Sequence, residues 1–333
     1  MKERAPRNRT LVVCESEKQE LIARTLSLAR PHEIHEIENR LIHQDLFSSV
    51  DFLPNEFIDL LIIDPPYNLD RKFSTSRFSK TSSESYEEWL ESWMLKLKRC
   101  LTRTASMYVC CDWRSSKSVQ SVLEKQFVVR NRITWEREKG RGAAANWKNC
   151  AEDIWFCTAS NDYVFNVEAV KLKRKVIAPY RHVSGEPKDW QETTNGNYRL
   201  THPSNLWTDI SIPFWSMPEN TDHPTQKPEK LVAKLILASS KPGDFIFDPF
   251  FGSGTTCVVA KKLGRRFSGV EQESEYCQLA VKRLDRAESD KSIQGYHDGY
   301  FWERNSLVDQ RQNKANKSDS TASISRLFDE QPD

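Results

Sequence analysis

The sequence has no long apolar run. Nowhere do about 18 consecutive apolar residues occur, which excludes an ordinary transmembrane helix. The amino-terminal segment MKERAPRNRT is charged and no apolar segment follows it, so we expect no secretory signal. Internal repeats are also absent. With 333 residues the chain suits one large domain, or one domain with a sizeable insertion.

The cysteines lack the spacing of a zinc site. None of the eight forms a CxxC pair, and none stands beside a histidine at zinc-binding spacing. Several lie in apolar stretches such as MYVCCDW, which indicates mostly buried, reduced thiols in a cytoplasmic protein and no metal site. The net charge of +2 neither indicates nor excludes nucleic-acid binding, for which a local basic surface is enough.

What the sequence does contain is an alternation of strand and helix patterns. The segment FIDLLIID at 57–64 is short, almost continuously apolar and stopped by two prolines, as expected of a buried strand. Further strands are expected at 106–113, 128–137, 151–160, 244–249 and 265–271, and helices at 85–101, 117–127, 228–240, 255–264 and 275–288. This order predicts an α/β fold with a doubly wound, mostly parallel sheet.

The first chemical motif is DPPYN at 64–68, directly after a predicted strand. Pro65 and Pro66 restrict the backbone and donate no hydrogen bonds, which leaves carbonyl acceptors beside the Asp64 carboxylate. Asp64 and the Pro65 carbonyl could each accept one N–H of an amino group while the ring of Tyr67 stacks on a base. The motif therefore suits a planar, amino-bearing base, although by itself it could be a turn after a strand.

The second motif is DPFFGSGTT at 248–256, between a predicted strand and a predicted helix. Gly252 and Gly254 allow a tight turn and a close approach to a ligand, and the helix start offers free N–H groups. Glu271 ends the next strand, about 20 residues beyond, where an acid binds ribose hydroxyls in nucleotide-binding βαβ units. The set predicts a site for an adenosine-containing cofactor, with a purely structural turn as the alternative.

The third motif is HPTQKP at 223–228, just before a predicted helix. Lys227 could bind a carboxylate, and Thr225 could cap the helix or donate a hydrogen bond. Ligands of open α/β sheets bind at the carboxyl ends of strands. If the strands before DPPYN and the glycine loop are neighbours, base and cofactor would therefore meet in one crevice.

Together the three motifs resemble the β group of amino-methylating DNA methyltransferases, of the restriction–modification type. That family places DPPY first, then a target-recognition region, an HPTxKP motif and an FxGxG cofactor loop, and residues 38–285 follow this order. The resemblance implies a permuted, Rossmann-like methyltransferase fold with S-adenosylmethionine as methyl donor. It also implies methylation of N6 of adenine in DNA, on a base flipped out of the duplex.

The resemblance also implies roles for individual residues. Asp64, Pro65, Pro66 and Tyr67 would form the catalytic pocket. The cofactor site would comprise the adenine contact Asp45, the carboxylate contacts Thr225 and Lys227, the strand-end Asp248, the methionine contacts Phe250, Gly252, Gly254 and Thr255, and the ribose contact Glu271.

The residue patterns and the resemblance together divide the chain into five segments. These are an extension (1–37) of unknown role, a catalytic half (38–166), an irregular target-recognition insertion (167–222), a cofactor-binding half (223–302) and a disordered tail (303–333). Candidate DNA contacts are Arg141 and Lys148 in the loop at 137–150, and Lys171, Lys173, Arg174 and Lys175 in the insertion. The last four could equally be a solvated run of charges. Homodimerisation and a cognate restriction endonuclease are further partners that the family suggests.

Several alternatives differ from this hypothesis in identifiable ways. N4-cytosine methyltransferases share the chemistry but more often carry Ser where this chain has Asp64. RNA or protein-glutamine methyltransferases usually place the glycine motif first, and a nicotinamide or flavin oxidoreductase would leave DPPYN and HPTQKP without a role. A non-catalytic cofactor- and DNA-binding regulator would not need the intact set from Asp64 to Tyr67.

Overall fold

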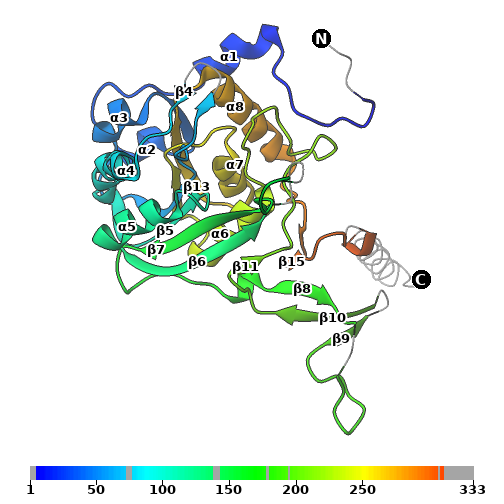
Figure 1. The fold of residues 1–333 in the computed structure, drawn as a ribbon. Helices are drawn as coiled ribbons and strands as arrows, with labels where there is room; N and C mark the ends of the chain where they lie inside the picture. Colours follow the sequence, from blue (N-terminus) through cyan, green and yellow to red (C-terminus); the bar gives the residue numbers. More distant parts are fainter. Residues whose placement is uncertain are drawn as a thin grey trace, which may run out of the picture. The chain divides into compact units, whose positions relative to one another are not determined.

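The structure is a computed structural model, and it describes residues 5–72, 77–137, 143–177, 180–193, 196–306 and 308–310. The chain forms two compact units (Figure 1). Unit 1 comprises Met1–Asn166 and Ser204–Ile293, and unit 2 comprises Val167–Pro203 and Gln294–Asp333. Within the described ranges, every helix is too short or too polar to cross a lipid bilayer.

Unit 1 is built on an eight-stranded sheet in the order β1-β13-β12-β2-β5-β7-β6-β11. All neighbours are parallel except β7, which runs antiparallel to both β5 and β6. The predicted α/β fold with a mostly parallel sheet is therefore confirmed. The strands are β1 (Arg40–His43), β2 (Ile58–Ile63), β5 (Leu101–Cys111), β6 (Val128–Glu136), β7 (Ala151–Thr158), β11 (Leu206–Trp207), β12 (Phe245–Asp248) and β13 (Arg266–Glu271).

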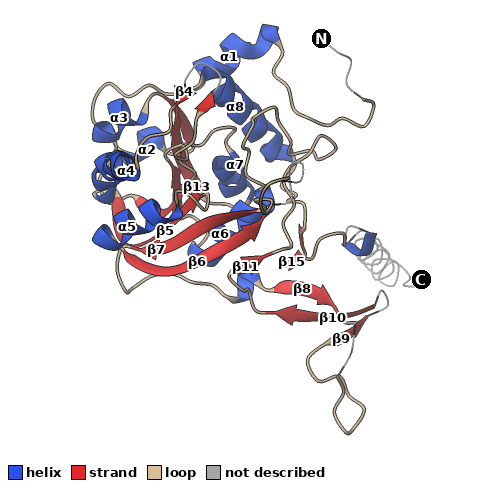
Figure 2. Ribbon diagram, viewed as in Figure 1, coloured by secondary structure: helices blue, strands red, loops and turns tan. Residues whose placement is uncertain are grey.

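Helices cover both faces of this sheet (Figure 2). One group is α2 (Ile34–Ile37), α3 (Leu46–Ser49), α4 (Ser83–Lys98) and α5 (Ser116–Gln126), and the other is α1 (Lys18–Ala23), α6 (Glu229–Ser239), α7 (Thr255–Lys262) and α8 (Ser274–Ser289). Short 3-10 helices lie at Glu15–Glu17 (η1), Val50–Phe52 (η2) and Glu168–Val170 (η3), and a small hairpin joins β3 (Arg71–Lys72) to β4 (Arg77–Phe78). Helix α4 buries Trp93 and Leu97 on one face, whereas Leu101, which the predicted helix at 85–101 included, begins β5.

Strands β12 and β2 are the neighbours that bring the two main motifs together. Ile246 pairs with Leu60 and Phe247 with Leu61 in parallel register, so DPPYN and the glycine loop leave the sheet at the same edge. The strands before DPPYN and before the glycine loop are therefore neighbours, which was the condition for base and cofactor to share one crevice. The next strand along the chain after β12 is its neighbour β13 on one side, and the neighbour of β2 on the other side is β5. The strand order therefore reverses between β12 and β2.

The described part of residues 1–37 belongs to unit 1. Helix α1 packs on α8, where Arg24 binds Asp285 through two hydrogen bonds. Leu11 packs with Tyr276 and Leu279 of α8 in a small apolar cluster. The described part of this segment therefore extends the core of unit 1.

Unit 2 is a five-stranded sheet in the order β14-β15-β8-β10-β9. Its strands are β8 (Leu172–Lys175), β9 (Gln191–Thr193), β10 (Gly196–Thr201), β14 (Tyr296–His297) and β15 (Tyr300–Trp302). Residues 294–302, which the sequence division assigned to the cofactor-binding half, lie in unit 2, because Phe301 and Trp302 are buried beside β8.

Residues 204–222 also belong to a different unit from the one that the sequence division gave them. The sequence division assigned them to the insertion, but they belong to unit 1. Asp209 forms ion pairs of 2.7 and 2.8 Å with Lys230 and Lys234 of α6, and β11 pairs with β6. Of the predicted tail, residues 303–306 and 308–310 are described, and the rest lies outside the described residues.

Candidate active site

A cavity of about 360 Å³ opens where β12 and β2 end, and its walls come from unit 1. This volume lies within the roughly 300–1,000 Å³ range of small-molecule sites. The lining contains every residue that we assigned to the catalytic pocket and all of the assigned cofactor residues except Gly254: Asp45, Asp64, Pro65, Pro66, Tyr67, Thr225, Lys227, Asp248, Phe250, Gly252, Thr255 and Glu271.

The DPPYN segment is held by side chains from two helices or their flanks. Tyr86 of α4 donates a hydrogen bond of 2.9 Å to the Pro66 carbonyl. Asn68 N–H donates to the Ser115 hydroxyl, and the Asn68 side chain bonds the backbone of Thr81. Tyr67 in turn donates its hydroxyl to Asp64 Oδ1 at 2.9 Å, which fixes the ring beside the carboxylate.

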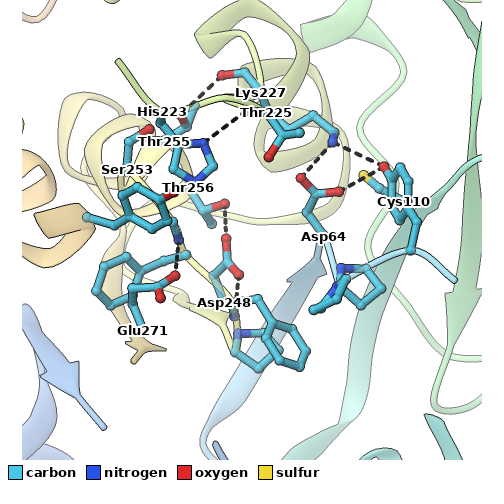
Figure 3. Close-up of a pocket in the computed structure, with 18 of the residues that line it drawn as sticks. Asp64, Cys110, His223, Thr225, Lys227, Asp248, Ser253, Thr255, Thr256 and Glu271 are labelled. Atoms are coloured by element: carbon cyan, nitrogen blue, oxygen red, sulfur yellow. Dashed lines mark hydrogen bonds and ion pairs between the residues drawn. The ribbon is translucent and has the colours of Figure 1, made fainter. Parts of the chain in front are cut away.

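Lys227 lies on the catalytic side of the cavity. Its ammonium is 2.6 Å from Asp64 Oδ2, 3.2 Å from the Tyr67 hydroxyl and 3.3 Å from Glu152 Oε2, and Figure 3 shows it pointing at Asp64. Burial alone would lower the pKa of Lys227, but the Asp64 and Glu152 carboxylates outweigh burial and raise it above its usual value. Lys227 is therefore a buried cation that holds Asp64 in place. Its role at the cofactor carboxylate stays a prediction, and Lys227 lines the same cavity as the other cofactor residues.

The glycine loop depends on backbone conformations that side chains disfavour. Gly252 has φ +52° and Gly254 has φ +78°. A Cβ on Gly254 would lie 2.6 Å from the Ala280 Cβ of α8, and one on Gly252 would lie 2.8 Å from His223 Nε2. Gly254 is thus required by helix packing, whereas Gly252 faces the cavity and the HPTQKP motif.

We predict that Gly254→Ala lowers the free energy of unfolding by about 3 kcal/mol, through the strained φ and the contact with Ala280. Gly264→Ala is the matched control, because its φ is +72° but a Cβ there meets nothing within 4 Å. It should cost only about 1 kcal/mol. Urea unfolding of the two variants measures the difference, and equal losses would contradict the packing argument.

His223 is a neutral residue at the wall of the cavity. Burial first, and then the nearby Lys227 and Arg283 cations, lower its pKa to about 3. Its Nδ1 accepts a hydrogen bond from the Thr225 N–H, and its ring packs edge-on against Tyr276, with ring centroids 4.3 Å apart. His223 therefore links the HPTQKP motif to α8.

Two carboxyl groups organise the glycine loop, Asp248, which is buried, and Glu271, which is partly buried. Asp248 accepts hydrogen bonds from Phe250 N–H (3.0 Å) and the Thr256 hydroxyl (2.6 Å). Glu271 accepts from Gly252 N–H (3.0 Å) and Glu273 N–H (2.8 Å). Burial raises the pKa of both groups to about 7. The predicted strand-end acids thus shape the loop as well as line the cavity.

The raised pKa of Asp248 predicts a pH dependence of stability. A carboxyl whose folded pKa is about 7, against 3.8 unfolded, stabilises the fold fully below pH 3.8, and this contribution is lost as the pH rises through 7. Asp248→Asn keeps the acceptor for Phe250 N–H and cannot ionise. Its melting temperature relative to wild type should therefore be higher at pH 8 than at pH 5. Thermal unfolding at the two pH values checks this, and a constant difference would refute it.

The remaining predicted cofactor residues have defined partners. Asp45 caps α3 by accepting the Ser48 N–H at 3.3 Å. Thr255 donates its hydroxyl to the Lys227 carbonyl at 3.1 Å, and Phe250 packs edge-on against Trp93 with ring centroids 5.2 Å apart. These contacts hold the three side chains at the cavity wall.

Several residues that line the cavity were not among the predicted site residues. Glu152 on β7 and Arg137 after β6 form an ion pair of 2.5 Å beside Lys227. Cys110 and Trp89 form an apolar part of the cavity wall. A buried acid within the apolar strand 151–158 was a possible signal, but the sequence offers two neighbouring acids there, Glu152 and Asp153.

The candidate DNA contacts are divided between the units. In unit 1, Lys148 is exposed, and Arg141 lies outside the described residues. In unit 2, Lys171 pairs with Glu168 and Arg174 with Glu303. The Lys173 ammonium lies 4.6 Å from the centre of the Trp302 ring, and Lys175 is exposed. Of the described candidates, Lys148 and Lys175 are therefore the two exposed cations.

The match to known families decides the assignment. A family model described as a DNA methylase matches residues 58–282, which span all three motifs and more than half of the chain. The chain belongs to this family. The predicted resemblance is thereby confirmed.

Individual members of the DNA methylase family match at similar levels. The DNA adenine methyltransferase YhdJ of Escherichia coli strain K12 is 32% identical over 254 residues, which cover 74% of this chain and 83% of that protein. The type II methyltransferase M.HpaI of Haemophilus parainfluenzae is 31% identical over 252 residues, covering 75% of each chain.

Solved structures show the same fold. The crystal structure of an M1.HpyAVI–SAM complex has a TM-score of 0.51 and 25% identity, and the match covers 74% of this chain and 98% of that one. The PvuII DNA methyltransferase, which is cytosine-N4-specific, has a TM-score of 0.54 at 17% identity, with 75% and 90% covered. The second likeness speaks for the fold alone.

Proposed function

We propose that this DNA methylase transfers a methyl group from S-adenosylmethionine to N6 of adenine in DNA. The observation that carries the proposal is the placement of Asp64 and Tyr67 beside the glycine loop, in one cavity at the ends of paired strands. The name of the Escherichia coli relative, a DNA adenine methyltransferase, supports adenine as the base.

The cavity residues fit the methyl donor. Glu271 uses its two oxygens for Gly252 and Glu273 N–H groups, and a carboxylate has about four acceptor positions, so it can also bind ribose hydroxyls. Asp45 would contact the adenine ring and Phe250 the methionine part. S-adenosylmethionine supplies an electrophilic methyl group on a sulfonium centre.

The chain's own contribution to the reaction is positioning and electrostatics. The lone pair of an exocyclic amine is delocalised into the base. Hydrogen bonds from that amine to Asp64 and to the Pro65 carbonyl would localise the lone pair on nitrogen, while Tyr67 stacks on the ring. Lys227 lies 2.6 Å from Asp64 Oδ2 and holds this carboxylate in place. Burial raises the pKa of the Cys110 thiol, so this nearby cysteine stays protonated and is no nucleophile.

Because the catalytic groups lie inside a cavity, the target base would have to leave the duplex stack. We assign reading of the DNA sequence to unit 2, and phosphate contacts to the exposed Lys148 and Lys175. We also propose a cytoplasmic location, which a DNA substrate supports, and a cognate restriction endonuclease as partner, which the type II name of M.HpaI supports. Homodimerisation can be tested by light scattering.

The test is methyl transfer from labelled S-adenosylmethionine to unmethylated bacterial DNA, followed by nucleoside digestion. Labelled N6-methyladenine supports the proposal. Labelled N4-methylcytosine would retain the mechanism and overturn the choice of base. Unlabelled DNA with bound cofactor would favour a regulator that binds without turnover.

A further inference from the structure

A chain of alternating charges runs from the cavity wall to the catalytic acid. Arg137 Nη1 lies 2.5 Å from Glu152 Oε1, Glu152 Oε2 lies 3.3 Å from Lys227 Nζ, and Lys227 Nζ lies 2.6 Å from Asp64 Oδ2. The Glu152 and Lys227 side chains are only 5% and 11% exposed. Low exposure makes these charges interact strongly, since little water screens them.

Charge balance explains why Arg137 is part of this group. Lys227 alone would leave one buried carboxylate without a counter-charge, which is costly. Arg137 supplies the second cation, so two cations meet two carboxylates. Removing the Glu152 charge would leave Lys227 and Arg137 against Asp64 alone.

The three donor positions of the Lys227 ammonium match three acceptors: Asp64, Tyr67 and Glu152. The Tyr67 hydroxyl also lies within 3.3 Å of Glu152 Oε2. Glu152 therefore competes with Asp64 for Lys227 and helps to orient the Tyr67 ring. Without Glu152, Lys227 would be drawn more fully to Asp64, whose oxygens would accept a substrate N–H less strongly.

We propose that Glu152 is a positioning residue for methyl transfer, which shares Lys227 with Asp64 and so keeps the Asp64 carboxylate a strong acceptor for the target amine. This inference rests on the proposed function. The competing explanation is that Glu152 only completes a structural ion cluster, as buried Glu229 does with Arg283 and Lys262.

The decisive variant is Glu152→Gln, which keeps size and an acceptor oxygen but removes the charge. We expect kcat to fall about tenfold, with KM for S-adenosylmethionine and DNA changed less than about twofold. A purely structural role would lower the melting temperature without separating the loss of kcat from the small change in KM.

Asp153→Asn is the matched control. Asp153 is the next residue on β7 and bonds the hydroxyls of Ser116 and Thr134, away from Lys227. This variant should retain the wild-type kcat, even where its melting temperature falls.

The double variant Glu152→Gln with Arg137→Gln separates charge balance from positioning. It restores neutrality, so thermal stability should recover towards wild type, while kcat should stay low because Lys227 still pairs with Asp64 alone. Recovery of both, or an unchanged kcat in Glu152→Gln, would overturn the inference. Product analysis of the wild type tests the proposed function separately, and the variants are compared on whichever base it methylates.

Discussion

Replacing Asp64 by Asn is expected to lower single-turnover methyl transfer by about 10³-fold. In the structure Asp64 accepts hydrogen bonds from Tyr67 and Lys227, and it faces the cavity. An amide would present a donor where the Lys227 ammonium or the target amine needs an acceptor. The change leaves the residues around the glycine loop intact, so affinity for S-adenosylmethionine should change less than about fivefold, as calorimetry would show.

Asp59→Asn is the control for this experiment. Asp59 lies on the same strand β2, accepts hydrogen bonds from Phe245 N–H and the Thr102 hydroxyl, and contributes nothing to the cavity lining. Burial raises its pKa, so a neutral side chain is tolerated there. Near-normal turnover by Asp64→Asn would refute the catalytic assignment. Equal losses in both variants would instead indicate general damage to β2.

Replacing Glu271 by Ala is expected to weaken S-adenosylmethionine binding by about 10²-fold. Two ribose hydrogen bonds to a charged acceptor would be lost, each contributing about 1.5 kcal/mol. The Gly252 N–H would also lose its acceptor, which loosens the loop that lines the cavity. Titration calorimetry with S-adenosylmethionine measures the loss directly.

The control for the cofactor site is Glu275→Ala, an exposed acid in the first turn of α8 four residues away. Its affinity for S-adenosylmethionine should match that of the wild type. If Glu271→Ala bound as tightly as this control, Glu271 would serve only to shape the loop, and the ribose contact would have to be sought elsewhere in the cavity.

Local patterns predicted the elements that carry the motifs. The apolar run before Asp64 and the segment DFIFDP each became a buried strand, β2 and β12. They are predictable because a strand buried on both faces needs an unbroken apolar run, and because prolines or glycines end it. Pro228, predicted as the first residue of a helix, stands instead at the cap position before α6, a difference of one residue.

Local sequence patterns could not predict the contacts of residues whose partners lie far away in the chain. Lys227 and Asp64 are 163 positions apart, and nothing near Lys227 in the sequence indicates which carboxylate it binds. Glu152 and Asp153 are adjacent acids on one strand, and only the direction of each side chain in the folded sheet shows that Glu152 faces the cavity. The boundary of unit 2 was missed for the same reason, since β15 joins β8 across more than a hundred residues.

The sequence by itself determined the family, the α/β class and the two strand-end motifs, because each depends on residues close together in the chain. The tertiary structure decided that β12 and β2 are neighbours, that Lys227 holds Asp64, and that Glu152 and Arg137 complete the charge balance. Those outcomes depend on which segments lie side by side after folding. Long-range packing and the balance of buried charges determine which segments become neighbours, and no local stretch of sequence specifies either of them.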